Sequence, residues 1–127
     1  MKNLKFLFVL LLAFPISIFA QSVEGNWKVT FPTQDGKTMD ALLIIDANGT
    51  YTVDLGMDGN VNVEGTYTMD GDKMTIQDIK GEQACLGDGT AGVYTITVDD
   101  KSLVMTRVND PCEGRGGPEG VMSFMKQ

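Results

Sequence analysis

Residues 65–76 read GTYTMDGDKMTI and residues 92–105 read GVYTITVDDKSLVM, so two separate stretches share one pattern. Each begins with Gly-x-Tyr-Thr, passes through an acidic turn, and continues as a second run in which apolar and polar residues alternate. Alternation with a period of two is typical of a half-buried β-strand, and a short Gly- or Asp-rich break is typical of a hairpin turn. The repeat therefore predicts two β-hairpins, and GTYTVD at 49–54 matches the first half of the pattern.

The rest of the chain beyond residue 20 continues this alternation, and no part of it shows a helical period. Short breaks rich in Gly, Asp or Asn separate the runs, and Asn48-Gly49 is a strong hairpin signal. The pattern predicts eight β-strands. They span residues 25–32, 38–46, 49–55, 60–69, 73–78, 91–98, 102–108 and 120–126.

The lengths of the connections predict how these strands are arranged. The connections that follow 38–46, 60–69 and 91–98 are two or three residues long, whereas the other four are longer. In an up-and-down meander, alternate connections lie at opposite ends of the sheet, so all the long loops should share one rim. Cys85 and Cys112 both lie in long loops, and two cysteines can pair in only one way. Their Cα atoms must lie within about 7 Å to bond, and a shared rim meets this condition.

An antiparallel sheet of eight strands would leave two exposed edges unless it closed on itself. We therefore predict an all-β fold, an eight-stranded antiparallel up-and-down barrel with one disulfide, in which the strand at 25–32 pairs with the strand at 120–126. The alternative is a two-sheet sandwich with Greek-key crossings. The Cys85–Cys112 disulfide should stabilise the fold by about 3 kcal/mol in the chain-entropy account.

Residues 1–20 differ in kind from the rest of the chain. Lys2 and Lys5 accompany the start of an uncharged apolar run that ends at Ala20. This arrangement is typical of a secretory signal peptide, and the alternative, a membrane anchor, needs about 20 apolar residues. We predict a cleaved signal peptide followed by one domain at 21–127, exported to the periplasm or the extracellular space, where disulfides form.

The chain is acidic, with a formal net charge of −7. Cleavage after residue 20 would remove two lysines and take the net charge to −9. Binding to nucleic acid or to an anionic membrane surface depends on positive charge that this domain lacks. We therefore expect no nucleic-acid partner and no membrane span after cleavage of the signal.

At the first strand, Gly25-Asn26-Trp27 resembles the Gly-x-Trp that opens the barrel of lipocalins and the wider calycin group. The segment from Cys85 to Arg115 is similar to bacterial secreted lipocalin-like domains of uncharacterised function. The resemblance implies a basic residue of the last strand packed across the tryptophan, a place that suits Lys126, although Arg is usual there. The Thr-Asp-Tyr triplet of lipocalins is missing between 91–98 and 102–108, so the resemblance implies a distant relative.

The residue types that usually carry catalysis are few. The chain has no His, which is the commonest general base near neutral pH, and both cysteines are expected to be bonded. The paired acids Asp70/Asp72 and Asp99/Asp100 lie in turns, where turn chemistry already explains them. The acidic residues at 54–64 do not match the spacing of an EF-hand, so we interpret them as solvated loop acids. We expect no enzymatic activity, no cofactor and no metal.

The face predicted to point into the barrel is rich in tyrosine and methionine. Methionine side chains fill irregular space and adapt to different guests. A barrel of eight strands has room either for its own side chains or for one small ligand, so these residues either fill the interior or line a site. The inward candidates for ligand binding are Tyr51, Tyr67, Tyr94, Met69, Met74 and Met105, and Met39 shares their face.

Arg107 is the most informative single residue. It continues the inward face of Met105 toward the rim of the long loops, so its guanidinium should lie in the mouth of an apolar barrel. A buried charge needs a partner. That partner is either an anionic group of a ligand, such as a carboxylate on an apolar tail, or an acidic residue of a rim loop, Asp110 or Glu113. Arg115 is expected to be an ordinary loop charge.

These observations favour a secreted or periplasmic binding protein that holds a small hydrophobic or amphipathic molecule in its barrel, anchored at Arg107. The alternative is a protein-binding module, such as a secreted inhibitor of a protease or lysozyme, whose glycine-rich loop from Glu113 to Gly120 would enter a cleft of its partner. A third hypothesis is a cell-surface structural protein without a ligand.

Overall fold

The structure is a computed structural model that describes residues 22–127, and the predicted signal peptide at 1–20 lies outside the described residues. Eight antiparallel strands form a closed barrel in the order of the sequence, so the predicted fold is confirmed and the sandwich alternative is wrong. No helix that could cross a membrane occurs in the described part of the chain. The strands are β1 (Gly25–Pro32), β2 (Thr38–Ile45), β3 (Thr50–Leu55), β4 (Val63–Asp70), β5 (Lys73–Lys80), β6 (Gly92–Val98), β7 (Ser102–Asn109) and β8 (Val121–Lys126).

The structure shortens the start of β4 relative to the prediction. Residues 60–62 were expected in the strand, but they belong to the loop between β3 and β4. Side chains hold this loop closed: the Asp54 carboxylate accepts hydrogen bonds from the backbone N–H groups of Asp58 and Gly59, and Asn62 Oδ1 accepts one from Leu55 N–H at 2.7 Å. Leu55 N–H is thus bonded to a side chain and not to a backbone carbonyl of the neighbouring strand, and the β3–β4 ladder ends at Val53↔Val63.

β5 is two residues longer than predicted, ending at Lys80, and its pairing with β4 contains a register shift between Glu64 and Gly65. Gly65 pairs with Asp78 across this irregularity. Asp78 continues the alternation of Met74 and Ile76 within this strand, and its side chain is buried. The strand therefore places a carboxylate on the inner side of the barrel.

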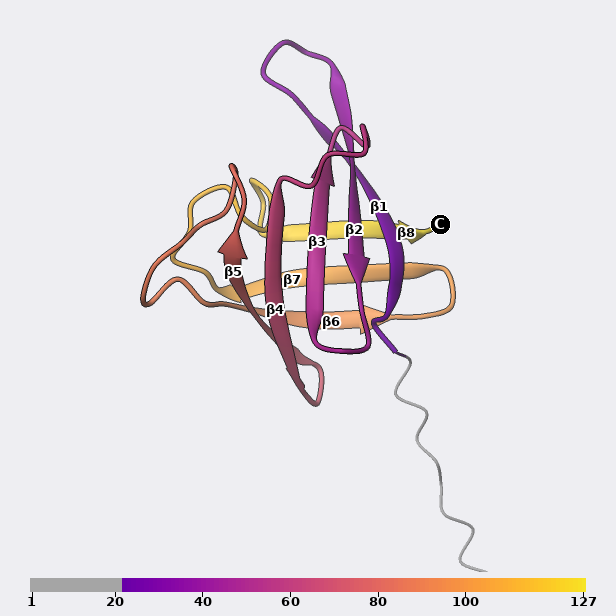
Figure 1. Ribbon diagram of the computed structural model, residues 1–127. Coiled ribbons are helices and arrows are strands. Elements are labelled where there is room, and N and C mark those ends of the chain that lie inside the picture. Colours follow the sequence, from indigo (N-terminus) through magenta and orange to yellow (C-terminus); the bar gives the residue numbers. More distant parts are fainter. Residues whose placement is uncertain (1–21) are drawn as a thin grey trace, which may run out of the picture.

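The connections are distributed as predicted. The three short turns lie at one end of the barrel, and the long loops 33–37, 56–62, 81–91 and 110–120 lie at the other, which we call the mouth. The disulfide between Cys85 and Cys112 joins two of the mouth loops, with its Cα atoms 6.2 Å apart. In Figure 1, β6–β8 cross behind β1–β4 at a steep angle, and the hairpin between β1 and β2 projects beyond the rest of the barrel.

The end opposite the mouth is filled by side chains. Trp27 is fully buried there, and its Nε1 donates a hydrogen bond to the Val23 carbonyl at 2.9 Å. Leu103 and Phe124 pair across β7 and β8 and complete this part of the core. Lys126 Nζ lies 5.7 Å from the centre of the Trp27 ring, which is the place that the calycin resemblance implies for it.

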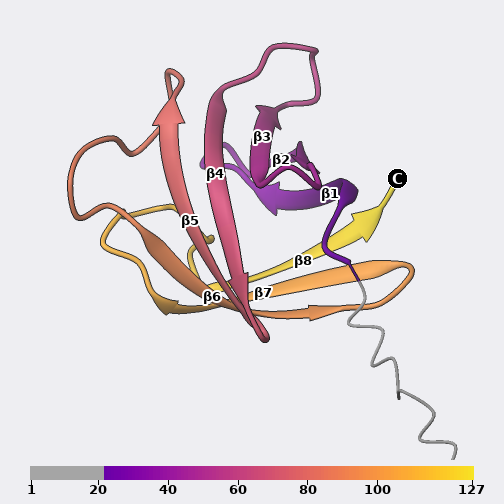
Figure 2. The same ribbon diagram turned by 60° about the horizontal axis from the view of Figure 1, so that its bottom comes forward.

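The seam between β1 and β8 is the weakest join of the barrel. Only Trp27↔Lys126 and Lys28↔Met125 pair across it, although β1 is eight residues long. Beyond Lys28 the two strands diverge toward the mouth, as Figure 2 shows. The barrel is therefore closed at the Trp27 end and opens along its side near the mouth.

Candidate ligand-binding site

A cavity of about 740 Å³ occupies the mouth half of the barrel. Its volume lies in the range of about 300–1,000 Å³ that is usual for pockets that bind small molecules. It reaches from the mouth loops down to the core, and it also meets both strands of the open seam, at Phe31 and Met122 among others. Most of its wall is apolar, as shown by Val29, Leu43, Val53, Leu55, Ile76 and Met122.

The cavity brings together only part of the residue set proposed from the sequence. Tyr51, Tyr67, Met74 and Met105 line it. Tyr94 is fully buried in the core beside it, and Met69 is exposed near the closed end, where it borders a shallow hollow. Met39, expected on the inward face, is 37% exposed because the β1–β2 hairpin projects past the barrel.

Arg107 does not line the cavity, and neither of its expected partners meets it. Its Nη2 donates hydrogen bonds to the carbonyl oxygens of Arg115 and Gly117, both at 2.8 Å. The β7–β8 loop folds back over the end of β7 and brings these carbonyls to the guanidinium. The expected acidic partner Asp110 binds Arg115 instead. The structure thus assigns Arg107 to holding this loop.

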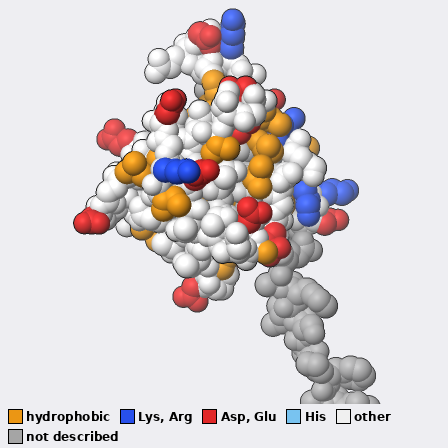
Figure 3. Space-filling view, in the orientation of Figure 1, with side chains coloured by type: hydrophobic (Ala, Val, Ile, Leu, Met, Phe, Trp, Pro, Cys, Tyr) orange, Lys and Arg blue, Asp and Glu red, His pale blue; other side chains and the backbone are white. Residues whose placement is uncertain are grey.

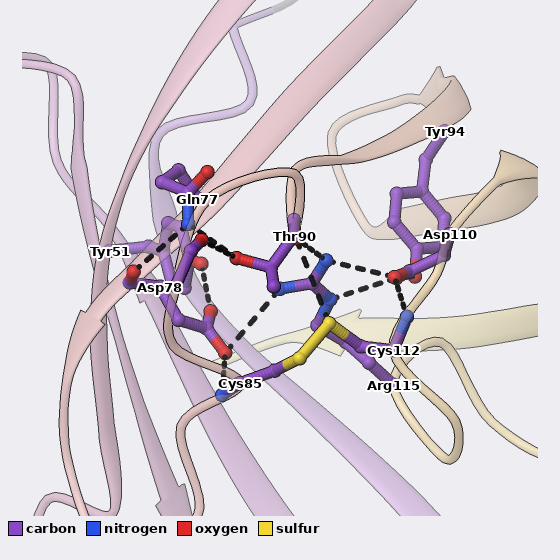
Figure 4. Close-up of a disulfide and its surroundings, with 10 residues drawn as sticks. Tyr51, Gln77, Asp78, Cys85, Thr90, Tyr94, Asp110, Cys112 and Arg115 are labelled. Carbon is purple, nitrogen blue, oxygen red and sulfur yellow. Dashed lines mark hydrogen bonds and ion pairs between the residues drawn. A yellow bond between two sulfur atoms is a disulfide. The ribbon is translucent and has the colours of Figure 1, made fainter.

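Arg115 was expected to be an ordinary loop charge, and that expectation is wrong. Its side chain is 14% exposed, and its guanidinium lies between two buried carboxylates (Figure 4). Nε and Nη2 donate to the two oxygens of Asp110, each at 2.8 Å, and Nη1 lies 3.5 Å from Asp78 Oδ2. Nη2 also donates to the Thr90 carbonyl. A paired arrangement of this kind is what allows an arginine to lie away from water.

Two tyrosines and the disulfide complete the cluster around Arg115. The Tyr51 hydroxyl donates to Asp78, and the Tyr94 hydroxyl donates to Asp110. The remaining acceptor positions take backbone N–H groups of the two half-cystines: Cys85 N–H donates to Asp78 and Cys112 N–H to Asp110, both at 2.9 Å. We call this set the Arg115 network. It consists of Tyr51, Asp78, Cys85, Thr90, Tyr94, Asp110, Cys112 and Arg115.

Glycines of the Gly-x-Tyr-Thr repeat make room for this network. A Cβ on Gly65 would overlap the ring of Tyr51, and one on Gly92 would press on the carboxylate of Asp110 and the guanidinium of Arg115. The repeat was interpreted as a hairpin signal, and here it has a second role. Its glycines allow tyrosine and arginine side chains to cross the neighbouring strand.

The titration behaviour of the network follows from its burial and pairing. Burial by itself would raise the pKa of Asp110, but hydrogen bonds from Arg115, Tyr94 and Cys112 N–H outweigh it and hold that pKa below its usual value. Burial of the Tyr51 hydroxyl, together with its hydrogen bond to Asp78, raises the pKa of Tyr51 far above its usual value. The pKa of Tyr94 is raised by burial and by Asp110 in the same way.

These raised tyrosine pKa values predict a loss of stability in alkali. The hydroxyls of Tyr51 and Tyr94 keep their protons in the folded protein and release them near pH 10 in the unfolded chain. The stabilisation is complete below about pH 10 and is lost above it, by up to about 1.4 kcal/mol per tyrosine per pH unit. Urea unfolding followed by circular dichroism between pH 8 and 11.5 measures this slope.

Substitution of both tyrosines by phenylalanine should lower stability at pH 8 but remove most of this alkaline slope. Tyrosinate absorbance at 295 nm gives an independent check in the folded wild-type protein. Ionisation of all three tyrosines near pH 10 without unfolding would contradict the assignment.

The sequence analysis did not identify Asp78 or Arg115 as residues of the site, although the strand pattern contained a signal for Asp78. Asp78 follows Met74 and Ile76 at the same alternation, so a polar residue stood at an inward position of the strand pattern. Arg115 left no such signal, because its direction depends on how the β7–β8 loop folds over the mouth.

Among residues 22–127, no three Cys, Asp or Glu side chains are placed so that they could ligate a metal ion. Asp54, considered above in a loop cluster, is buried and accepts two backbone N–H groups, so its role is to fix the β3–β4 loop. Of the carboxylates that line the cavity, Asp78 is bound by Arg115 and the Tyr51 hydroxyl.

Comparison of the chain with protein-family models and with curated proteins found no match. The barrel and its disulfide are therefore assigned from the structure of this chain alone.

Proposed function

We propose that this chain is a non-catalytic binding protein, distantly related to the lipocalins, that holds a small hydrophobic or amphipathic molecule in its barrel. The observation that carries the proposal is the apolar cavity of about 740 Å³ between the filled Trp27 end and the mouth. Empty apolar volume in a small domain forgoes packing that would otherwise stabilise it. A guest molecule would restore those contacts.

Three features of the described residues support a lipocalin-like origin. They are the closed eight-stranded barrel, the Gly25-Asn26-Trp27 opening of β1, and Lys126 over the Trp27 ring. The disulfide between Cys85 and Cys112 is typical of oxidising compartments and supports an exported protein, periplasmic or extracellular.

The alternative, a protein-binding module, relied on a loop from Glu113 to Gly120 that enters a partner's cleft. In the structure, Arg107 binds two carbonyls of this loop, and Cys112 and Arg115 fix its base. Several of its residues also line the cavity. We therefore favour a role for this loop as part of the cavity wall.

The test is to fill the cavity by substitution. Val53 lies on the cavity wall, whereas its neighbour Thr52 is on the outer face of the same strand. Val53→Trp should weaken binding of a fluorescent apolar probe at least tenfold, about 1.4 kcal/mol, because the indole takes the space of the guest. Thr52→Trp is the matched control and should bind as the wild type does.

Native mass spectrometry of protein purified from its own host should also show a bound small molecule. The proposal fails if the folded protein carries no such mass and binds no apolar probe. It also fails if the two tryptophan variants bind the probe equally well.

A further inference from the structure

The four loops around the mouth are strongly acidic. They contain seven carboxylate side chains and two cationic ones. In Figure 3, acidic side chains lie around the margins of the molecule where several of these loops are found. The carboxylates are Asp35, Asp58, Glu82, Asp88, Asp110, Glu113 and Glu119, and the cations are Lys37 and Arg115.

Two of these carboxylates belong to the cavity wall. Glu113 and Glu119 both line the cavity at the β7–β8 loop, and both are exposed. Neither of them has an ion-pair partner among residues 22–127. Their charges are therefore free to act on whatever occupies the entrance.

The cavity wall offers no free positive charge in return. Arg115 is its only cationic residue in the described chain, and it is held between Asp110 and Asp78. The wall itself carries three carboxylates, Asp78, Glu113 and Glu119, against this one guanidinium, so it has an excess of negative charge. Since water is partly excluded there, this charge acts more strongly on a nearby group than it would on the surface.

From these charges we infer that the cavity selects molecules whose apolar body carries a positively charged group, such as an amine or a quaternary ammonium. Their apolar part lies among the aliphatic side chains of the barrel, and their cation lies at the mouth between Glu113 and Glu119. Anionic amphiphiles such as fatty acids are disfavoured, because Arg107, their expected anchor, is taken by loop carbonyls. This inference rests on the proposed function and names the ligand class for the same cavity.

Three ligands with one decyl chain test the inference: decyltrimethylammonium, decanol and decanoate. Their affinities are measured by isothermal titration calorimetry at pH 7, below the concentrations at which they form micelles, with circular dichroism to confirm that the protein stays folded. We expect decyltrimethylammonium to bind at least tenfold more tightly than decanoate, with decanol between them. The difference should shrink as salt is added, since the rim carboxylates are exposed.

Paired variants locate the effect. Glu113→Gln/Glu119→Gln should bring the affinities for the cation and the carboxylate closer by at least threefold. Glu82→Gln/Asp88→Asn removes the same charge from a mouth loop whose two acids do not line the cavity, and it should have a smaller effect.

The outcomes separate the two claims. Binding of none of the three ligands would overturn the proposed function. Decanoate binding as tightly as decyltrimethylammonium would overturn the charge selection and leave the binding function standing. Tetramethylammonium, which lacks the chain, should bind far more weakly than decyltrimethylammonium. Equal binding of the two cations would show attraction to the acidic surface without use of the cavity, and would also overturn the inference.

Discussion

Replacing Arg115 by methionine should lower the free energy of unfolding by about 3–5 kcal/mol, which is the usual cost of removing one partner from a buried ion pair. The substitution keeps most of the apolar stem but leaves Asp78 and Asp110 facing each other without a cation. The side chain of Asp78 is 3% exposed and that of Asp110 is 0% exposed, so both charges would be left buried without the guanidinium. Equilibrium unfolding in urea measures the change.

Lys80→Met is the matched control. Lys80 of β5 forms an ion pair with Glu64 of β4 at 3.0 Å, and the Lys80 side chain is 72% exposed. An exposed pair of this kind contributes about 0–1 kcal/mol. Both methionine variants remove one positive charge, but only Arg115 is buried. The difference between their losses of unfolding free energy therefore measures the effect of burial. Similar losses in both variants would contradict the role given to Arg115.

A compensated variant gives a second arm if Arg115→Met does not fold. Adding Asp78→Asn and Asp110→Asn to Arg115→Met removes the uncompensated negative charges while keeping hydrogen-bonding side chains. Since replacing a whole buried ionic cluster costs much less than removing one member, the triple variant should be more stable than Arg115→Met alone. A triple variant that is less stable than the single one would show that the carboxylate charges are not the cause.

The barrel itself could be derived from the sequence because its signals are local. Alternation marks each strand, Asn48-Gly49 and the acidic turns mark the hairpins, and the two cysteines fall in loops of the same rim. All three signals indicate the same up-and-down arrangement of strands. The strand ends were less well determined, as between β3 and β4, where the Asn62 side chain binds the Leu55 N–H that the pattern had assigned to a ladder.

The side-chain contacts at the mouth of the barrel could not be derived from the sequence in the same way. The register correctly placed Arg107 at the mouth end of β7, but the direction of a long side chain depends on the loop that covers it. Here that loop presents carbonyls to Arg107 and inserts Arg115 between two acids. Loop geometry of this kind depends on contacts between distant residues, which a periodic pattern does not contain.

Removing the disulfide is the second change with a large expected effect. Cys85→Ala/Cys112→Ala should lower the free energy of unfolding by about 3–4 kcal/mol, because the bond closes a loop with a sequence separation of 27. The loss is measured by urea unfolding of the double variant against the oxidised wild type. A loss below 1 kcal/mol would show that the mouth loops are held in place without the bond.

The same variant shows whether the disulfide also orders the Arg115 network. If the bond acts only by restricting the unfolded chain, its loss and that of Tyr51→Phe, which takes one donor from Asp78, should add within about 0.5 kcal/mol. Cys85 N–H and Cys112 N–H bind the two carboxylates around Arg115, so we expect a coupling of about 0.5–3 kcal/mol instead. Trp27→Phe, at the opposite end of the barrel, is the control and should be additive with disulfide loss. Additivity with both substitutions would mean that the carboxylates keep their positions without the bond, and that the loops alone organise the mouth.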